Sequence, residues 1–327
     1  MSYQIYRDIN KQEAKAMRDV FCETMLEIAK EDERIVYMDA DLMNSIGMRP
    51  FAKEYPERTI NCGIQEANMV GVAAGLSVAG KVPFLHTFGV FASRRVADQV
   101  FISAAFAQAN IRIIGSDPGV TASFNGGTHM PFEDMGIMRG IPGVTVIEPT
   151  DSVMLADIVR QLKDKKGVFY IRLSRKNAVQ VFESGSVFEI GKAATVREGR
   201  DVSIIASGIC VADAREAAEM LGREGISAQV INMFTIKPVD RDAVVRAAKN
   251  TGCIVTAENH NVINGLGSAV AEVLAENCPV PMERVGVMDE FGEVGSVDFL
   301  KARFKITAEE IARKAKIAVG RKNKGSI

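Results

Sequence analysis

The sequence has no hydrophobic run that could cross a membrane: its longest, residues 69–80, has about twelve residues, whereas a membrane helix needs about 20. It also has no excess of charge, because 40 basic residues face 41 acidic ones, so binding to nucleic acid or to an anionic membrane is not expected. The opening stretch MSYQIYRDINKQEAK has no signal-peptide core. Five cysteines form no CxxC pair, which predicts reduced thiols, a cytoplasmic protein and no zinc site.

Several familiar motifs are also missing. No GxGxxG follows a predicted strand, and no GxxxxGK[ST], GxSxG or HExxH occurs anywhere in the chain. These absences weigh against a nicotinamide enzyme, a P-loop nucleotidase, an α/β-hydrolase and a zinc protease.

The chain has 327 residues, of which 47% are hydrophobic and 25% charged, as is typical of globular proteins. This length predicts two domains. A Gly/Ser/Glu stretch without clear pattern suggests a linker at 183–191, which separates a first domain at 1–182 from a second at 192–327.

In the first half, predicted strands alternate with predicted helices. The helix expected at 66–79 is too apolar to be exposed, and its small residues suit close contact with another helix, in the core or across a subunit interface. Strands are expected at 35–39, 59–64, 82–86, 111–115, 144–148 and 168–173, further helices at 11–30, 91–109 and 152–162, and a long loop at 116–133.

The second half repeats this alternation. Strands are expected at 202–206, 228–232, 253–257 and 282–286, and helices at 211–221, 240–249, 266–276 and 308–318. The fold class predicted is therefore α/β, with two open, mostly parallel domains whose sheets are covered on both faces.

Glu66 opens the apolar helix directly after a strand. Most glutamates at a helix start are simply solvated and gain from the helix dipole. The functional alternative is a half-buried carboxylate with a raised pKa, able to share a proton with a ligand nitrogen.

Aromatic residues and histidines follow predicted strand ends. Phe88 and Phe91 could pack in the core or form a wall for a flat heterocycle. His86 and His129 could each be surface residues, but open parallel sheets bind ligands at the carboxyl ends of their strands.

The segment SFNGGTHMPFED is the sharpest local signal, because two glycines allow the backbone to approach a ligand closely just before His129. Arg18, Ser45 and Arg175 are candidate anion ligands, although each alone could be an ordinary surface residue.

Taken together, these segments resemble the transketolase family. GIQEANMVGVAAGL, HTFGVFASRRVADQ, GGTHMPFED, IPGVTVIEPTD and IRLSRKN resemble its pyrimidine-binding domain, and FTIKPVD, AENHNVINGLGSAVAEVL and FGEVGS its C-terminal domain. The motifs occur in the family's order over nearly the whole chain, which makes the set far more specific than any one of them.

The resemblance implies that the coenzyme is thiamine diphosphate. Glu66 then matches the glutamate that pairs with the aminopyrimidine ring and exchanges a proton with it, with the ligand nitrogen as its only partner. Phe88 and Phe91 match the ring's aromatic pocket, and Arg94 stands where some transketolases carry another aromatic residue. Asp41 and Ile64 are also expected beside the coenzyme.

The resemblance also assigns residues to the sugar substrate. His129 matches a histidine that reaches substrate hydroxyls and a developing oxyanion, and His86 is expected to contact substrate too. Arg18, Ser45 and Arg175 match side chains that hold a sugar phosphate.

Two departures concern the sugar. Asn125 stands where the family usually has Asp, so the preferred sugar is open. Asp117 stands where a phosphate-binding histidine is usual, and a carboxylate there repels a phosphate unless it is paired. The terminal phosphate of the sugar could be held differently, or the substrate could be an atypical ketose or its sulfonate analogue.

The family's GDG motif, which grips the diphosphate through a metal ion, is absent. We therefore expect a split enzyme, in which a separate N-terminal subunit binds the diphosphate with Mg²⁺ or Ca²⁺, in an α2β2 assembly with self-association. The expected reaction moves a two-carbon ketol unit between sugars or sugar phosphates.

Four alternatives remain open at this point. Two are other enzyme halves: the β subunit of a 2-oxoacid dehydrogenase, and part of a 1-deoxyxylulose-5-phosphate synthase-like carboligase. A third is a non-catalytic partner subunit, against which the retention of Glu66, Phe88 and His129 argues. The last is a flavoprotein-like nucleotide-binding chain, which bound flavin absorbance on purification would support.

Overall fold

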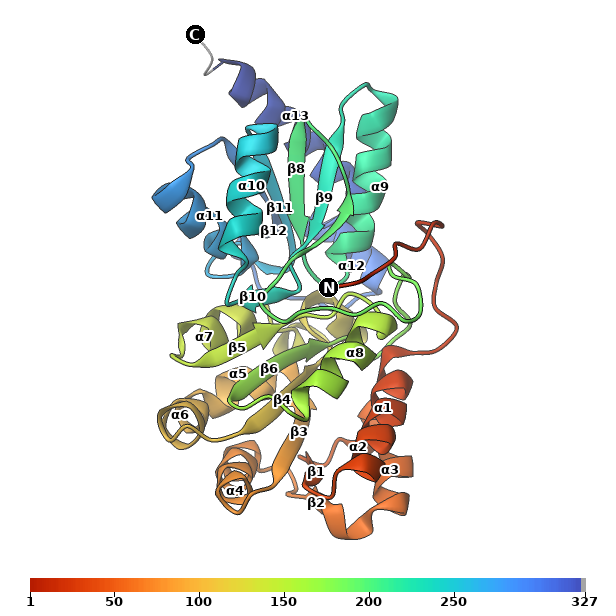
Figure 1. Ribbon diagram of the computed structural model, residues 1–327, viewed down its shortest axis with the longest axis vertical. Helices are drawn as coiled ribbons and strands as arrows, with labels where there is room; N and C mark the ends of the chain where they lie inside the picture. Colours follow the sequence, from red (N-terminus) through yellow and green to blue (C-terminus); the bar gives the residue numbers. More distant parts are fainter. Residues whose placement is uncertain (325–327) are drawn as a thin grey trace.

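The computed structural model describes residues 1–324 and contains two β-sheets, each covered by helices on both faces. One sheet with its helices lies above the other in the view of Figure 1. Most neighbouring strands are parallel, so the predicted α/β class is confirmed. No helix within residues 1–324 is both long and apolar enough to span a membrane.

The first sheet has seven strands in the order β10-β5-β6-β4-β3-β1-β2. Its middle strands are apolar and buried, as expected when helices cover both faces of a parallel sheet. The strands are β1 (Ile35–Asp39), β2 (Thr59–Asn61), β3 (Val82–Phe88), β4 (Ile111–Ser116), β5 (Val144–Ile147), β6 (Val168–Leu173) and β10 (Thr235–Lys237).

One strand of this sheet comes from the second half of the sequence. β10 runs antiparallel to β5, with Thr235 opposite Ile147, and the amide of Glu148 donates to the carbonyl of Phe234 at 2.8 Å. The sequence analysis did not predict β10, which joins the two halves of the chain through backbone hydrogen bonds.

The second sheet has five strands in the order β12-β11-β8-β9-β7. Its edge strand β7 is antiparallel and was not predicted, whereas the other four run parallel. The strands are β7 (Ala194–Arg197), β8 (Val202–Ala206), β9 (Ala228–Asn232), β11 (Ile254–Asn261) and β12 (Met282–Val287).

Two apolar cores lie under the helices, and each continues from the first sheet to the second. One lies under α1, α8, α9 and α13, and the other under α4, α7, α10, α11 and the π-helix η3. The α-helices are α1 (Met17–Glu31), α2 (Met43–Ile46), α3 (Arg49–Glu54), α4 (Glu66–Val78), α5 (Gly89–Ser93), α6 (Ala97–Gln99), α7 (Asp134–Gly140), α8 (Ser152–Leu162), α9 (Cys210–Arg223), α10 (Arg241–Thr251), α11 (Leu266–Asn277), α12 (Val297–Arg303) and α13 (Ala308–Lys324). The other helical turns are η1 (Pro56–Arg58), η2 (Arg94–Val96), η3 (Val100–Phe106), η4 (Gly119–Asn125) and η5 (Gly127–His129).

Two predicted helices differ from the structure. The helix expected at 11–30 begins only at Met17, because the preceding residues pair with 178–179. The helix expected at 91–109 is broken into α5, η2, α6 and η3. The hydroxyl of Ser93 donates to the carbonyl of Gly89 at 2.7 Å, a back-bond that often bends helices.

The segment predicted as a linker is packed against the start of the chain. Val187 pairs with Ser2, and the ring of buried Phe188 lies 4.7 Å from that of Phe182. The limits 1–182 and 192–327 stay predictions, and residues 325–327 lie outside the described residues.

Candidate functional site

The carboxyl ends of four neighbouring strands bring most of the predicted site residues to one edge of the first sheet. β6, β4, β3 and β1 are adjacent and parallel. Arg175, Asp117, Phe88 and Asp41 therefore follow or end these strands on the same side, where open α/β sheets bind their ligands.

Glu66 begins α4 beside this edge, and only 2% of its surface is exposed. Nη1 of Arg95 lies 2.9 Å from each carboxylate oxygen, and the hydroxyl of Thr87 donates to Oε1 at 3.2 Å. The prediction of a half-buried carboxylate whose only partner is a ligand nitrogen is therefore wrong: the group is almost fully buried, and two side chains of this chain already contact it.

Three rings form a wall next to this ion pair. The ring of His129 lies edge-on, with its centroid 5.4 Å from that of Phe91 and 6.0 Å from that of Phe88. The guanidinium of Arg95 stacks over Phe91 at 3.9 Å, and Thr128 Oγ1 lies 2.9 Å from Nδ1 of His129. These contacts place the GGTH turn directly against the aromatic pair.

Arg94 holds the same turn from its other side. Its Nε lies 2.8 Å from a carboxylate oxygen of Glu133, and its Nη2 donates to the carbonyl of Thr128 at 3.3 Å. Burial raises the pKa of Glu133, while the nearby arginine opposes that rise. In this structure Arg94 thus braces the turn that carries His129.

The predicted anion ligands also meet. Nη1 of Arg18 and Nη1 of Arg175 donate to the carbonyl oxygen of Ser45 at 3.1 and 3.2 Å. Asp117, which is 3% exposed, forms an ion pair with Nη2 of Arg175. The carboxylate expected to repel a phosphate is therefore paired, and in this pair it offsets one of the two guanidinium charges.

His86 lies beneath the site. Its side chain is fully buried; Nδ1 is 2.9 Å from Asp39 Oδ2, and Nε2 is 2.9 Å from Ser116 Oγ. The predicted direct contact with substrate does not fit this arrangement, because β3 continues two residues past the predicted end and encloses the ring between β1 and β4.

Three further predicted residues lie at the rim. Asp41 and Asn125 are exposed, and Ile64 is 70% exposed just before α4. The side chain of Asp41 accepts a hydrogen bond from Asn61 at 3.2 Å. Their roles toward coenzyme and sugar stay predictions.

A single series of contacts connects the two ends of the site. The sequence analysis missed Arg95 in this series, although its position four residues after the aromatic Phe91 is a usable signal. The series runs Glu66–Arg95 (2.9 Å), Arg95–Phe91 (3.9 Å), Phe91–His129 (5.4 Å), His129–Phe88 (6.0 Å), Phe88–Arg175 (5.0 Å), and then Ser45 and Arg18.

A buried polar network supports the loop before His129 and was also missed. Arg172 donates to Asp134 at 2.8 Å and to the carbonyl of Asn259 at 2.9 Å. Asn259 Oδ1 in turn accepts from the amide of Val120 at 2.8 Å. The network therefore connects β11, a strand of the second sheet, to η4, a turn that follows β4 of the first sheet.

Two titratable groups border this network. Burial raises the pKa of Glu258 to about 8, although that carboxylate accepts two backbone hydrogen bonds at the start of α11. Burial lowers the pKa of His260 to about 4.

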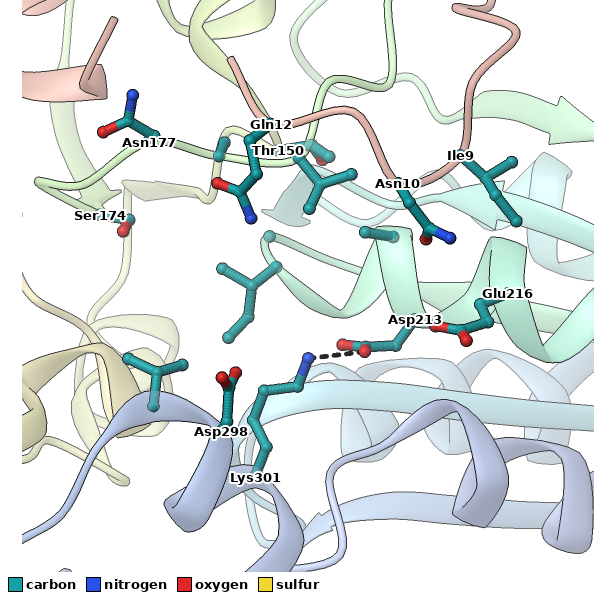
Figure 2. A pocket seen from close by; sticks show the side chains of 16 residues that line it. Ile9, Asn10, Gln12, Thr150, Ser174, Asn177, Asp213, Glu216, Asp298 and Lys301 are labelled. Atoms are coloured by element: carbon teal, nitrogen blue, oxygen red, sulfur yellow. Dashed lines mark hydrogen bonds and ion pairs between the residues drawn. The ribbon is translucent and has the colours of Figure 1, made fainter. Parts of the chain in front are cut away.

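Figure 2 shows a separate cavity of about 240 Å³ between the N-terminal segment, α9 and α12. Lys301 Nζ lies 2.6 Å from Asp213, and the carboxylates of Glu216 and Asp298 line the same space. With three carboxylates and one ammonium, this cavity is unfavourable for an anionic ligand. None of the predicted site residues lines it.

Among residues 1–324, no group of three or more His, Cys, Asp or Glu side chains is arranged to hold a metal ion.

Comparison with protein families assigns both halves of the chain. Residues 13–180 match the family model "Transketolase, pyrimidine binding domain", and residues 191–311 match "Transketolase, C-terminal domain". These matches confirm the resemblance drawn from the sequence motifs.

Known proteins give the same result over nearly the full length. The chain is 53% identical to the 6-deoxy-6-sulfo-D-fructose transketolase subunit SqwH of Clostridium sp. (strain MSTE9), over 96% of this chain and 97% of that protein. It is 37% identical to an apulose-4-phosphate transketolase subunit of Phocaeicola vulgatus, over 92% and 96%. A solved structure described as "Split gene transketolase, inactive beta4 tetramer" aligns with a TM-score of 0.88 at 41% identity, over 94% of this chain and 99% of that one.

Proposed function

Since this chain belongs to the transketolase family, we propose that it is the C-terminal subunit of a two-chain enzyme that transfers a two-carbon ketol unit from a ketose to an aldose. The observation that carries this proposal is the series of contacts from Glu66 to Arg18. It connects a buried carboxylate, an aromatic wall, a histidine and an arginine pair through successive contacts.

The residues present fit the pyrimidine end of thiamine diphosphate. Phe88 and Phe91 offer faces for a flat ring, and the buried carboxylate of Glu66 can hold or release a proton at a ring nitrogen. When bound, this coenzyme supplies the nucleophilic carbon that carries the two-carbon unit. His129, which lies against both rings, is suited to donate to a substrate oxygen.

A second chain completes the enzyme in this proposal. The present sequence has no GDG motif, so the diphosphate and a Mg²⁺ or Ca²⁺ ion are assigned to an N-terminal subunit. The related split enzyme of known structure is described as an inactive β4 tetramer, and we expect this chain to be inactive alone as well.

An exposed apolar surface on α4 and η3 is a candidate for self-association within an α2β2 assembly. We call this surface the α4/η3 face. The two helices are in contact, and exposed apolar side chains gathered on adjoining helices often mark protein interfaces. Its members are Val72, Val78, Phe101, Ile102 and Phe106, exposed by 36 to 88%.

The ketose donor is proposed to carry an anionic tail, because Arg18 and Arg175 lie at the end of the site farthest along the contact series from Glu66. The related Clostridium subunit is named for a sulfonated ketose, and the Phocaeicola subunit for a sugar phosphate.

All five cysteines are free thiols, which favours a cytoplasmic setting.

The test is reconstitution with a partner chain that carries GDG. The two chains together, with thiamine diphosphate and Mg²⁺, are expected to transfer ketol units to an aldose, and neither chain alone should do so. Decarboxylation of pyruvate or a branched 2-oxoacid without ketol transfer would favour a 2-oxoacid dehydrogenase component. Condensation of pyruvate with a sugar phosphate would favour a synthase-like half, and normal activity without this chain would make it a non-catalytic partner.

A further inference from the structure

Two guanidinium groups from distant parts of the chain converge on one serine. Arg18 lies in α1 and Arg175 follows β6, yet both donate to the carbonyl of Ser45, and Arg175 also contacts the Ser45 hydroxyl. Like charges held this close repel each other, so the cluster favours a bound anion.

Both arginines also keep a donor unused. The Nε atoms of Arg18 and Arg175 are buried, and neither has a hydrogen-bond acceptor among the described residues. The nearest carboxylate oxygen to Arg18 Nε belongs to Asp19, at 3.6 Å. Buried charged donors without acceptors are unfavourable, and the oxygens of a bound anion would satisfy them.

Asp117 reduces the positive charge of this cluster. Its carboxylate is 3% exposed and forms an ion pair with Arg175, whose guanidinium also lies 5.0 Å from the ring of Phe88. Solvent screens a carboxylate at this depth only weakly, so an anion on Arg175 experiences its charge. Asp19, the other nearby carboxylate, is 53% exposed at its side chain and is therefore largely screened.

We propose that Asp117 makes the Arg18–Ser45–Arg175 cluster select a ketose with a monoanionic sulfonate tail over one with a dianionic phosphate tail. Two guanidinium charges and one buried carboxylate leave a net charge of about +1. A sulfonate brings this sum to zero, whereas a phosphate near pH 7 carries about −1.5 to −2 and leaves a buried negative charge uncompensated. This inference rests on the proposed function and specifies its substrate class.

The experiment compares two donors that differ in the tail, 6-deoxy-6-sulfofructose and fructose 6-phosphate, in the reconstituted two-chain enzyme. The unsubstituted enzyme should have the higher kcat/KM for the sulfonate. D117N should raise the phosphate-to-sulfonate ratio of kcat/KM by about tenfold or more, mainly through KM, because one buried charge is removed. E27Q is the matched control: it removes a carboxylate that pairs with Arg160 on the exposed surface, and should leave the ratio unchanged.

A second measurement needs no substitution. A phosphate monoester becomes monoanionic below about pH 6, whereas a sulfonate keeps one charge. For the unsubstituted enzyme, kcat/KM for the phosphate donor should therefore rise relative to the sulfonate donor as pH falls through about 6, and D117N should weaken this trend.

The possible outcomes separate the two claims. An active enzyme that shows no sulfonate preference, no relative rise at low pH and no change of ratio in D117N would overturn the charge selection and leave the proposed function standing. Absence of ketol transfer from either donor would overturn the proposed function and this inference with it.

Discussion

Glu66 forms an ion pair with Arg95, whose Nη1 lies 2.9 Å from both carboxylate oxygens while its guanidinium stacks on the ring of Phe91. The two partners differ in exposure: 2% of the glutamate side chain is exposed, but 43% of the arginine side chain. The arginine can therefore swing into solvent, whereas the carboxylate must remain where α4 places it. Substitutions at the two positions should consequently have different effects.

Replacing Glu66 with Gln keeps the size of the side chain but removes a group that can gain and lose a proton. In the reconstituted enzyme, kcat should fall by about 100-fold or more, the usual contribution of a positioned acid or base. The measurement is steady-state ketol transfer, with thermal unfolding as a check that the variant folds. An unchanged kcat in E66Q would contradict the assigned role.

Replacing Arg95 with Met frees Glu66 from its ion pair but preserves packing on Phe91. Arg95 contacts the carboxylate that the proposed function assigns to the coenzyme ring, and the ring must compete with it. R95M should therefore bind thiamine diphosphate several-fold more tightly in the two-chain complex. Calorimetric titration measures this affinity. Weaker binding in R95M would instead mean that the arginine itself contacts the coenzyme.

His260 should make the protein sensitive to acid. Burial lowers the pKa of this ring from 6.5 to about 4, so the folded protein keeps it neutral where the unfolded chain binds a proton. The contribution of His260 to the free energy of unfolding is fully present above pH 6.5 and is lost as pH falls toward 4. At pH 5 the loss amounts to roughly 2 kcal/mol.

Denaturant unfolding of this chain at pH 7 and pH 5 measures that loss. The variant H260Q should be less stable at pH 7, because the ring's 2.7 Å hydrogen bond with the carbonyl of Asn261 is altered. It should, however, lose less stability between pH 7 and pH 5. Equal losses in both proteins would show that another group titrates.

The α4/η3 face should be where copies of this chain meet. Phe106 on η3 is 81% exposed, and a charge there opposes burial in an interface. Light scattering should show F106D shifted toward monomer. F291D is the control, since Phe291 is 96% exposed in the segment between β12 and α12. If F106D assembles like the unsubstituted chain, the contact lies elsewhere.

Much of the fold was accessible from the sequence, because buried parallel strands and amphipathic helices have different hydrophobic periods. The strand-end rule directed attention to the carboxyl ends of the first sheet through His86 and His129, whereas Asp117 and the role of Arg175 came from the resemblance to the transketolase family. These signals are local, or depend only on the order of elements along the chain.

The remaining features depend on packing between distant segments. β10 has only three residues and pairs with a strand about 90 residues earlier, so no local pattern marks it. The predicted contact of His86 with substrate does not fit the structure, because β3 extends two residues beyond its predicted end and the ring is buried between Asp39 and Ser116. The Glu66–Arg95 pair depends on how the chain breaks between α5 and η3, where periodicity alone predicted one continuous helix.

β10 also restricts how the site can open. This short strand belongs to the second half of the sequence, but it is hydrogen-bonded to β5 in the sheet of the first half. The two halves therefore cannot separate by a hinge motion without breaking the backbone hydrogen bonds between β10 and β5. They move as one unit for as long as the β10–β5 pairing holds. A fragment that ends near residue 182 would leave β5 as a bare edge, inviting aggregation.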